Sequence, residues 1–438
     1  MSARHARVRA SASLRGSVVV PGDKSISHRA LILASQARGE CRITGLSRGG
    51  DVRNTARALR GLGVALGPWG SEPLVVRGAG LGGWREPGGV LDFGNSGTGI
   101  RLMAGMLAAH PFFSVLTGDR YLRRRPMRRV AEPLRLMGAR IAGRAGGTLA
   151  PLAIEGTRLS GAAYRSPVAS AQVKSALLLA GLLAAGETSV AEPELSRDHT
   201  ERMLRFLGVT VRVSGTTVGV RGGGEWAARD LEIPGDPSSA AFLLAAAVIS
   251  PDAEVTVRGV CVNPTRTGFF EILRAMGARL RLTRRRVVCG EPVADLTAST
   301  SRLRGVEVPP EIVPRAIDEF PILAATALFA RGRTRITGAA ELRVKESDRI
   351  RTMAAELAKL GGRVLELPDG LQIDGGHPLR GAACASHGDH RVAMSLAVAA
   401  GAIRGETSIA DTACVATSFP EFWDLMRGLG ARLSEERP

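Results

Sequence analysis

The chain has 438 residues, 45% of them hydrophobic, a length that favours two domains of roughly 200 residues over a single core. Aromatic residues make up only 4%, so Ala, Leu and Val must build the cores, which suits helices covering a sheet, and the longest apolar stretches, near ten residues, exclude a membrane span, which needs about 20. The net charge of +18 suits either nucleic acid or a cleft for small anions; the scarcity of aromatic stacking residues favours small anions.

A helix–glycine–strand phrase recurs six times along the chain. The first copy reads LRGLGVAL at residues 59–66 and the last reads MRGLGARL at residues 426–433. A glycine directly after a helix suits the left-handed C′ position, and the alternating residues after it are typical of a strand. The six glycines, spaced 69 to 84 residues apart, are Gly63, Gly138, Gly208, Gly277, Gly361 and Gly430.

A second series, offset from the first, joins a polar cluster to an apolar helix. Its six members are residues 24–35, 95–107, 170–183, 236–248, 318–330 and 389–400. Each start carries Ser, Asn, Asp or Gly where an N-cap is needed, so each repeat is predicted to run strand, helix, strand, helix, strand, strand. Three repeats precede about residue 235 and three follow it. A single start of this kind is an ordinary capped helix, but several converging starts would form an anion site.

Lysine is rare in this chain, with four residues against 55 arginines. Such a bias replaces Lys by Arg wherever either serves, so a surviving Lys indicates a need for a compact, proton-exchanging ammonium. Lys24 and Lys345 lie in polar motifs and are the favoured functional lysines. Lys174 follows another motif and is interpreted as supporting it, and Lys359 as ordinary helix surface.

Ten motifs occur in an order that resembles the 5-enolpyruvylshikimate-3-phosphate synthase family along nearly the whole chain. They are PGDKSISHRA, GNSGTGIR, RPM, SAQVKSALLLAG, RDHTE, NPTRTG, DEFPILA, LRVKESDR, DHRVAMS and TSFPEF. RDHTE, NPTRTG and TSFPEF are typical of the second bacterial class of this enzyme.

The resemblance implies an α/β fold of two pseudo-threefold domains built from six βαβαββ repeats, the inside-out α/β barrel of enolpyruvyl transferases. Residues 21–235 are expected to form the first domain, and residues 1–20 with 236–438 the second, because the amino-terminal strand belongs with the second domain. The implied enzyme, 3-phosphoshikimate 1-carboxyvinyltransferase, moves the enolpyruvyl group of phosphoenolpyruvate to the 5-hydroxyl of shikimate 3-phosphate and releases phosphate. This step belongs to the shikimate pathway, which leads to chorismate and the aromatic amino acids. No metal, cofactor, nucleic acid or membrane is expected, and the protein is expected to be a monomer.

The resemblance also implies the site residues. Those around phosphoenolpyruvate are Lys24, Gly97, Arg125, Gln172, Arg349 and Arg391. Those around shikimate 3-phosphate are Lys24, Ser25, Arg29, Ser170, Ala171, Gln172, Arg197, Asp318 and Lys345. Arginine forks suit the carboxylate and phosphate groups of both substrates. Addition and elimination need one proton delivered to the methylene and one taken from the hydroxyl; Asp318 is assigned as the base and Glu346 as the donor, with Lys24 sharing this work.

Several of these residues have simpler explanations. Asp318 could cap its helix, and Glu346 with Arg349 could be a surface pair worth about 0.3 kcal/mol. Of the arginine run at residues 123–129 only Arg125 matches the family pattern, and the others are expected to be solvated. His28 and His390 are interpreted as structural.

Two family positions differ here: Thr417 stands where many relatives have Lys, and Glu341 where many have Asn. Gly97 predicts sensitivity to the phosphonate herbicide glyphosate, which in this family occupies the phosphoenolpyruvate site.

Two other functions remain open on the sequence. One is the sister enzyme that loads enolpyruvyl onto a UDP-sugar, which has Lys-Asn where this chain has Lys24-Ser25 and usually a reactive Cys on a loop that here, at residues 112–125, has none. The other is a basic RNA-binding repeat protein. Five scattered cysteines without a CxxC pair indicate reduced thiols, and the Arg-rich first ten residues lack the apolar region of a secretory signal, so a cytoplasmic location is expected.

Overall fold

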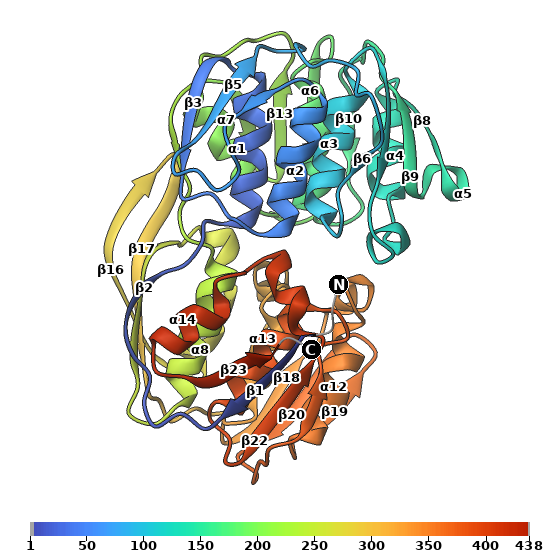
Figure 1. Ribbon diagram of the computed structural model, residues 1–438. Coiled ribbons are helices and arrows are strands. Elements are labelled where there is room, and N and C mark those ends of the chain that lie inside the picture. Colours follow the sequence, from blue (N-terminus) through green and yellow to red (C-terminus); the bar gives the residue numbers. More distant parts are fainter. Residues whose placement is uncertain (1–3, 437–438) are drawn as a thin grey trace. The chain divides into compact units, whose positions relative to one another are not determined.

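A computed structural model describes residues 4–436 of the chain, which divide into two compact units (Figure 1). Unit 1 contains the described residues of Met1–Pro21, Pro234–Val287 and Pro292–Pro438. Unit 2 contains Gly22–Ile233 and Val288–Glu291.

Unit 2 contains three four-stranded sheets of one topology. The first has the order β14 (Leu231–Glu232), β3 (Arg38–Thr44), β5 (Leu74–Ala79), β4 (Ala65–Leu66). The second has the order β6 (Leu91–Asp92), β7 (Phe113–Thr117), β9 (Leu149–Glu155), β8 (Arg140–Gly143). The third has the order β10 (Ala163–Arg165), β11 (Glu187–Ala191), β13 (Thr217–Arg221), β12 (Val211–Ser214). In each sheet the first pair is parallel and the other two pairs are antiparallel.

The helices of unit 2 fall into two kinds. Three are buried along most of their length, and α3 packs against both of the others: α1 (Lys24–Gln36), α3 (Gly97–Ala108) and α6 (Ala171–Gly181). Three are amphipathic and expose one face: α2 (Gly50–Gly61), α4 (Arg128–Leu136) and α7 (His199–Phe206). A short helix, α5 (Arg144–Gly147), lies beside β8 and β9.

Unit 1 repeats this plan. One sheet has the order β16 (Arg279–Val288), β17 (Glu291–Ser299), β15 (Glu254–Cys261), β2 (Arg15–Val19). Another has the order β21 (Ala383–Ala385), β22 (Glu406–Ala410), β1 (His5–Arg9), β23 (Arg432–Glu436). The last has the order β18 (Gly332–Ile336), β20 (Gly370–Gly375), β19 (Arg363–Leu367), and parallel bridges to Arg304 and Glu307 stand where its first strand would be.

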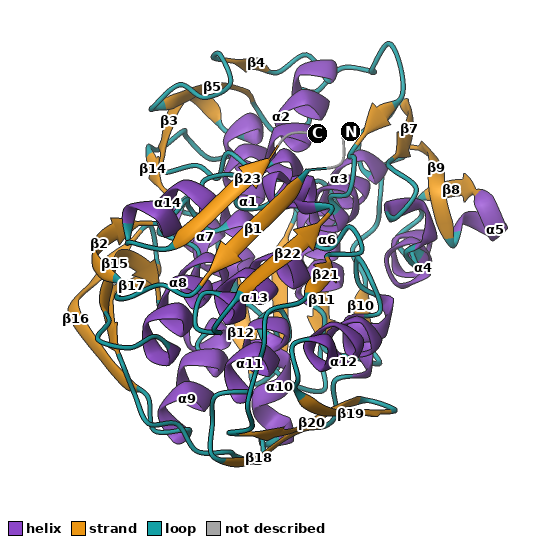
Figure 2. Ribbon diagram, turned by 60° about the horizontal axis from the view of Figure 1, so that its bottom comes forward, coloured by secondary structure: helices purple, strands orange, loops and turns teal. Residues whose placement is uncertain are grey.

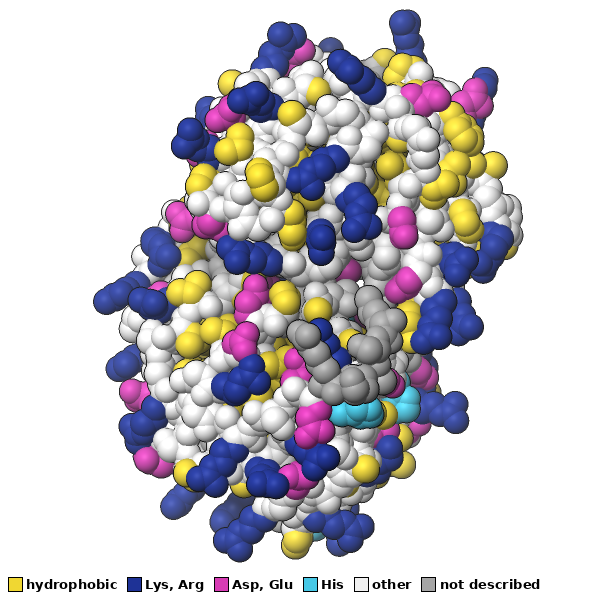
Figure 3. All heavy atoms as spheres, in the orientation of Figure 1, with side chains coloured by type: hydrophobic (Ala, Val, Ile, Leu, Met, Phe, Trp, Pro, Cys, Tyr) yellow, Lys and Arg dark blue, Asp and Glu magenta, His cyan; other side chains and the backbone are white. Residues whose placement is uncertain are grey.

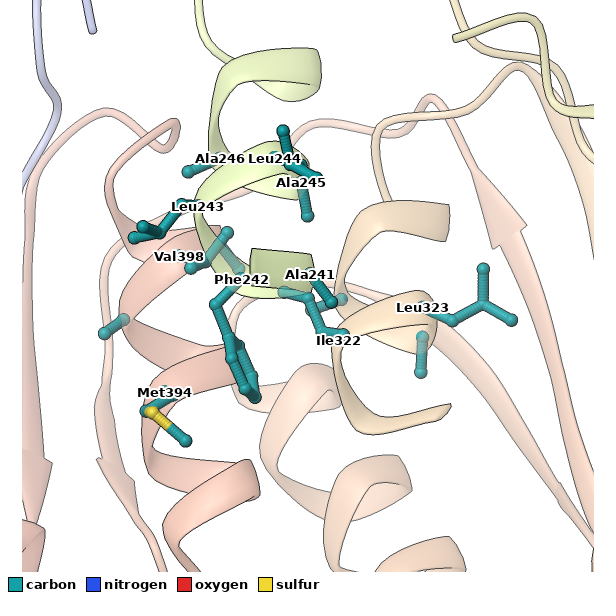
Figure 4. Close-up of a cluster of buried hydrophobic side chains, with 14 of the residues drawn as sticks. Ala241, Phe242, Leu243, Leu244, Ala245, Ala246, Ile322, Leu323, Met394 and Val398 are labelled. Atoms are coloured by element: carbon teal, nitrogen blue, oxygen red, sulfur yellow. The ribbon is translucent and has the colours of Figure 1, made fainter. Parts of the chain in front are cut away.

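The core of unit 1 lies among three buried helices that pack on one another: α8 (Pro237–Ile249), α11 (Phe320–Ala327) and α13 (His390–Ala400). Phe242 of α8 lies between the other two, with Ile322 of α11 and Met394 of α13 nearby (Figure 4). The remaining α-helices of unit 1 are α9 (Gly268–Ala275), α10 (Val313–Ala316), α12 (Arg349–Lys359) and α14 (Phe422–Gly428).

Short 3-10 helices occur in both units. Unit 2 contains η1 (Leu122–Arg124), and unit 1 contains η2 (Pro264–Arg266), η3 (Pro310–Ile312), η4 (Ala340–Val344) and η5 (Thr412–Thr417).

The sheets therefore cover the buried helices, and the composition-based expectation of helices covering a sheet is wrong. A helix that is apolar on all sides must be enclosed by other elements. A sheet whose strands alternate buried and exposed residues can instead face solvent on one side. The βαβαββ repeats and the inside-out arrangement that the motifs predicted are confirmed. The predicted glycine positions are confirmed as well, because all six follow the second helix of a repeat with φ between +84° and +102°.

Both termini of the sequence contribute to the same sheet. β1 lies between β22 and β23 and pairs antiparallel with each, which Figure 2 shows as three adjacent arrows. β2 pairs parallel with β15. The first 20 residues thus supply strands to unit 1 before the chain enters unit 2.

The turn between β16 and β17 groups with unit 2, although the sequence analysis assigned residues 288–291 to the second domain. Glu291 Oε1 lies 2.7 Å from Nδ1 of the buried His199, and Arg202 Nη1 donates to the Gly290 carbonyl at 3.1 Å. These contacts to α7 attach the turn to unit 2.

Replacing one of the six helix-end glycines tests this backbone conformation directly. A Cβ at Gly138 (φ +102°) would meet nothing within 4 Å, so Gly138→Ala should lower the free energy of unfolding by about 1 kcal/mol through strain alone. Urea denaturation followed by circular dichroism measures this loss. Gly88→Ala in the same unit is the control, because Gly88 is exposed, has open space and lacks a positive φ. Equal free energies of unfolding for the two variants would show that the positive φ at Gly138 does not strain an alanine there.

Candidate active site

In unit 2, the candidate residues gather at the first turns of the three buried helices. Lys24, Gly97 and Ala171 are the first residues of α1, α3 and α6. Asp23 caps α1 by accepting from the Ile26 N–H at 2.8 Å, and Ser96 caps α3. Helix starts with unpaired N–H groups favour anions, so this end of unit 2 suits an anionic ligand.

Lys24 is paired with a carboxylate that sequence reasoning missed. Its Nζ donates to Oδ2 of Asp51, in the first turn of α2, at 2.9 Å. The Lys24 side chain is 19% exposed, and Asp51 is almost wholly buried. The ammonium therefore keeps access to solvent and is held in place by a fixed carboxylate partner.

The start of α3 is lined by two guanidinium groups. A Cβ built on Gly97 would lie 2.7 Å from Arg125 Nη1 and 3.0 Å from Arg101 Nη1. Arg125 is buried, whereas Arg123, Arg124 and Arg128 of the same run are exposed, so the structure separates Arg125 from its neighbours as the family pattern does.

Arg101, which sequence reasoning missed although it ends the GNSGTGIR motif, links α3 to α6. Its Nη1 donates to Gln172 Oε1 at 2.7 Å and to the Gly97 carbonyl at 3.3 Å. Gln172 Nε2 donates in turn to Thr98 Oγ1 at 3.1 Å. The structure thus brings Gly97, Arg125 and Gln172 together, and Arg101 fixes the amide of Gln172.

Arg29 is held from three directions inside unit 2. Nε donates to Thr200 Oγ1 at 2.7 Å, Nη2 to Ser175 Oγ at 2.6 Å, and Nη1 to the Ser25 carbonyl at 2.8 Å. Burial lowers the pKa of Arg29 to about 10, so it stays charged at neutral pH. A guanidinium has five N–H donors, which leaves two beyond these three contacts. Arg197, another predicted residue, lies between the buried Ser196 and Asp198, the N-cap of α7.

His28 has the structural role that the sequence analysis assigned to it. Nδ1 hydrogen-bonds with Thr55 Oγ1 at 2.8 Å, and Nε2 with Ser96 Oγ at 3.3 Å. Burial, then the charges of Lys24 and Arg29, lower its pKa well below the ordinary value, so the ring is neutral. The neutral His28 connects α1 to α2 and to the N-cap of α3.

In unit 1, Arg349 gathers three carboxylates. Nε donates to Asp389 Oδ2 at 2.8 Å and Nη2 to Glu346 Oε2 at 2.7 Å, while Nη1 lies 3.7 Å from Asp318 Oδ1. Burial alone would lower the pKa of Arg349, but Asp389, Glu346 and Asp318 raise it above the ordinary value. The same contact lowers the pKa of Asp389 against the effect of its burial. Asp389, which opens the DHRVAMS motif, is a further residue that sequence reasoning missed.

The simpler explanations for Asp318 and Glu346 are wrong. The N-cap of α11 is Glu319, and Asp318 lies in the turn before it, where its carbonyl accepts from Arg391 Nη1 at 2.9 Å. Glu346 and Arg349 do form an i,i+3 pair, but their side chains are only 13% and 1% exposed, so the pair is not a surface pair. Burial strengthens the Coulomb attraction within such a pair, while the cost of desolvating both charges offsets part of the gain.

The three buried helices of unit 1 also begin close together. Ser238, in the first turn of α8, donates to the carboxylate of Glu319, which caps α11. Arg391, in the first turn of α13, places Nη1 3.8 Å from the same Glu319 carboxylate. Arg266 of the NPTRTG motif donates to Ser238 Oγ at 2.8 Å and supports this junction from η2.

Lys345, another predicted residue, lies in unit 1. It directly follows η4 and places Nζ 3.3 Å from Oε1 of Glu341, the residue that departs from the family pattern.

Within residues 4–436, no cluster of three His, Cys, Asp or Glu side chains is arranged to hold a metal ion. No helix in that range is long and apolar enough to cross a bilayer.

Comparison with known proteins agrees with these motifs. A family model described as EPSP synthase (3-phosphoshikimate 1-carboxyvinyltransferase) matches residues 8–426. A relative of that name from Geobacter sp. (strain M21) is 54% identical over 420 residues, covering 96% of this chain and 98% of the relative. One from Gloeobacter violaceus is 56% identical over 412 residues, covering 94% and 95%. A solved structure of EPSP synthase from Acinetobacter baumannii matches with a TM-score of 0.89 and 43% identity over 99% of this chain and 100% of the other. The chain therefore belongs to the EPSP synthase family.

Proposed function

We propose that this protein is a 3-phosphoshikimate 1-carboxyvinyltransferase of the shikimate pathway. It transfers the enolpyruvyl group of phosphoenolpyruvate to the 5-hydroxyl of shikimate 3-phosphate and releases phosphate. The observation that carries the proposal is the identity of more than half to relatives of that name over nearly the whole chain. The candidate residues support it, because most of them lie at the starts of buried helices, and Arg349 with Glu346 lies at the start of α12.

The proposed binding roles follow the charges of the substrates. Arg125 with Gly97 and Gln172 in unit 2, and Arg349 with Arg391 in unit 1, hold phosphoenolpyruvate, because guanidinium forks match carboxylate and phosphate groups. The residues proposed around shikimate 3-phosphate are Ser25, Arg29, Ser170, Ala171, Gln172, Arg197, Asp318 and Lys345, and Lys24 contacts both substrates.

The proposed chemistry uses the carboxylates around Arg349. Asp318 takes the proton of the 5-hydroxyl as the oxygen adds to C2 of phosphoenolpyruvate, the carbon that carries the phosphate, and Glu346 delivers a proton to the methylene. Arg349 Nη2 donates to Glu346 Oε2 at 2.7 Å. We propose that the carboxylate of phosphoenolpyruvate takes over this hydrogen bond, so that Glu346 can carry a proton. Elimination reverses the transfer at the methylene and expels phosphate. The protein is proposed to act as a cytoplasmic monomer without metal or cofactor.

One assay separates this function from the two others. Phosphate release from phosphoenolpyruvate should saturate with shikimate 3-phosphate and should not occur with a UDP-sugar acceptor. An RNA-binding protein would instead bind RNA in a salt-dependent way and ignore shikimate 3-phosphate. On the face drawn in Figure 3, Lys and Arg side chains are spread among acidic ones rather than gathered in one patch, which favours the enzyme. Phosphate release indifferent to shikimate 3-phosphate would refute the proposal.

Lys24→Arg tests whether the compact ammonium is needed. The variant keeps the charge but replaces a proton-exchanging group, paired with Asp51 at 2.9 Å, by a planar fork. Turnover should fall at least about tenfold, which is ~1.4 kcal/mol in the activation barrier. Lys359→Arg is the control, because Lys359 pairs with Glu356 on α12 with 45% of its side chain exposed. Near-normal kcat in Lys24→Arg would show that charge alone is enough.

Asp318→Asn tests the base. Asn keeps the shape of the side chain but cannot take the hydroxyl proton, so kcat should fall at least about 100-fold while thermal unfolding is unchanged. Asp374→Asn provides the comparison, because Asp374 forms an exposed pair with Arg333 across two strands. A small effect on kcat would assign the base to another residue.

Gly97→Ala tests the phosphoenolpyruvate subsite. The wild type should be inhibited by glyphosate in competition with phosphoenolpyruvate. The added methyl would meet Arg125 Nη1 at 2.7 Å, so it should displace this guanidinium and exclude the longer inhibitor more than the substrate. The inhibition constant should therefore rise by a larger factor than the KM for phosphoenolpyruvate. Gly88→Ala should change neither. A wild type indifferent to glyphosate would show that another residue sets the response.

A further inference from the structure

The proposed reaction leaves one buried charged cluster of unit 2 without a role. Lys174, in the second turn of α6, has 1% of its side chain exposed. Its Nζ lies 2.9 Å from Glu192 Oε2 and 2.8 Å from Glu201 Oε1, and it donates to the Ser196 carbonyl at 3.4 Å. Glu192 directly follows β11, and Glu201 belongs to α7. The cluster therefore joins three elements of unit 2.

The cluster requires lysine rather than arginine. An ammonium has three N–H donors on one atom, and here three oxygens from three directions surround that atom. A planar guanidinium could not present its donors in this way. Burial alone would lower the pKa of Lys174, but Glu201 and Glu192 raise it above the ordinary value, so the lysine stays charged. A buried ion cluster of this kind adds little net stability compared with apolar packing, which points to a role in fixing geometry.

Glu192 connects Lys174 to two segments of the chain that carry proposed substrate-binding residues. Its Oε1 accepts from the Ser170 backbone N–H at 2.7 Å, and its Oε2 accepts from Ser196 Oγ at 2.7 Å. Ser170 is the N-cap of α6, yet its side chain makes no capping hydrogen bond. Glu192 thus anchors Ser170 through the backbone, which leaves the hydroxyl to another partner. Ser196 directly precedes Arg197.

Neighbours of the cluster also fix Arg29. Ser175, next to Lys174, and Thr200, next to Glu201, accept from Arg29 at 2.6 and 2.7 Å, and their hydroxyls lie 2.7 Å apart. A shift of α6 against α7 would therefore move both acceptors of Arg29. Ser170, Arg197 and Arg29 are all proposed to bind shikimate 3-phosphate. The cluster contacts Ser170 directly, and it contacts Arg197 and Arg29 through their neighbours.

We infer that Lys174 is a positioning residue for shikimate 3-phosphate, acting through Glu192 and Glu201 without touching the substrate. The inference rests on the proposed function, so wild-type phosphate release with shikimate 3-phosphate is measured first. Failure there would refute the function rather than the role of Lys174.

The test compares Lys174→Met with Glu192→Gln. In the second variant the new side-chain amide can still accept from the Ser170 N–H through Oε1, but its Nε2 cannot accept from Lys174 or Ser196. Titration calorimetry with shikimate 3-phosphate alone gives its Kd, and steady-state kinetics give both KM values. In both variants the Kd and the KM for shikimate 3-phosphate should rise at least about tenfold, because small misplacements of binding groups are costly. The KM for phosphoenolpyruvate should change less than about threefold.

Two further variants sharpen the result. Lys174→Arg keeps the charge and should not restore the affinity for shikimate 3-phosphate, because the guanidinium does not fit the three acceptors. Lys359→Met removes the partly exposed lysine of α12 and should leave both KM values unchanged. The Lys174→Met variant could unfold, because it leaves two buried carboxylates without their cation. In that case Glu192→Gln tests the inference, since it removes a charge without changing the size of the side chain. Lower thermal stability with unchanged Kd for shikimate 3-phosphate, or an equal rise in both KM values, would overturn the inference.

Discussion

Enclosure of apolar helices is the constraint on which the rest of this structure depends. α1, α3 and α6 in unit 2, and α8, α11 and α13 in unit 1, are buried over most of their length, and sheets must cover them. Polar side chains of these helices are then favoured mainly at the helix ends, where solvent or a ligand can form hydrogen bonds with them. Contacts such as Arg101–Gln172 between α3 and α6, and Ser238–Glu319 between α8 and α11, show that neighbouring helices start together. The packing that makes each unit stable also places its polar residues at one end.

Cations near these helix starts are paired with fixed carboxylates. Lys24 has Asp51, and Arg349 has Asp389 with Glu346. Such partners lower the cost of burying positive charge and hold each cation in one geometry, at the risk of competing with the anionic ligand. Under the function proposed above, a ligand with a carboxylate and a phosphate takes the place of Glu346 at Arg349, and Asp389 stays in place.

Much of this architecture could be predicted from the sequence because its signals are local. The six glycines and the helix starts depend on neighbours within a few residues, and Gly63 or Gly430 can be recognised without knowing the rest of the fold. Arg125 and Asp318 were assigned through the family resemblance of their motifs, and their roles stay predictions. The carboxylate partners could not be predicted, since Asp51 lies 27 residues from Lys24 and Asp389 lies 40 from Arg349, and no spacing rule joins them. The family resemblance predicted the enclosure of helices by sheets, whereas composition alone gave the wrong layer order because it does not say which layer is outside.

The position of β1 between β22 and β23 has a consequence for synthesis of the chain. The first strand emerges from the ribosome about 400 residues before its partners, Glu406–Ala410 and Arg432–Glu436, have been made. At roughly 5–20 residues per second this is a wait of about 20 to 80 seconds. Meanwhile Gly22–Ile233 has been made and can bury its own helices, and unit 2 then lacks only Val288–Glu291. The exposed face of β1 carries His5, Arg7 and Arg9, and positive charge on a waiting strand discourages pairing between nascent chains. β1 can therefore pair with β22 and β23 only after residues 406–436 have been made.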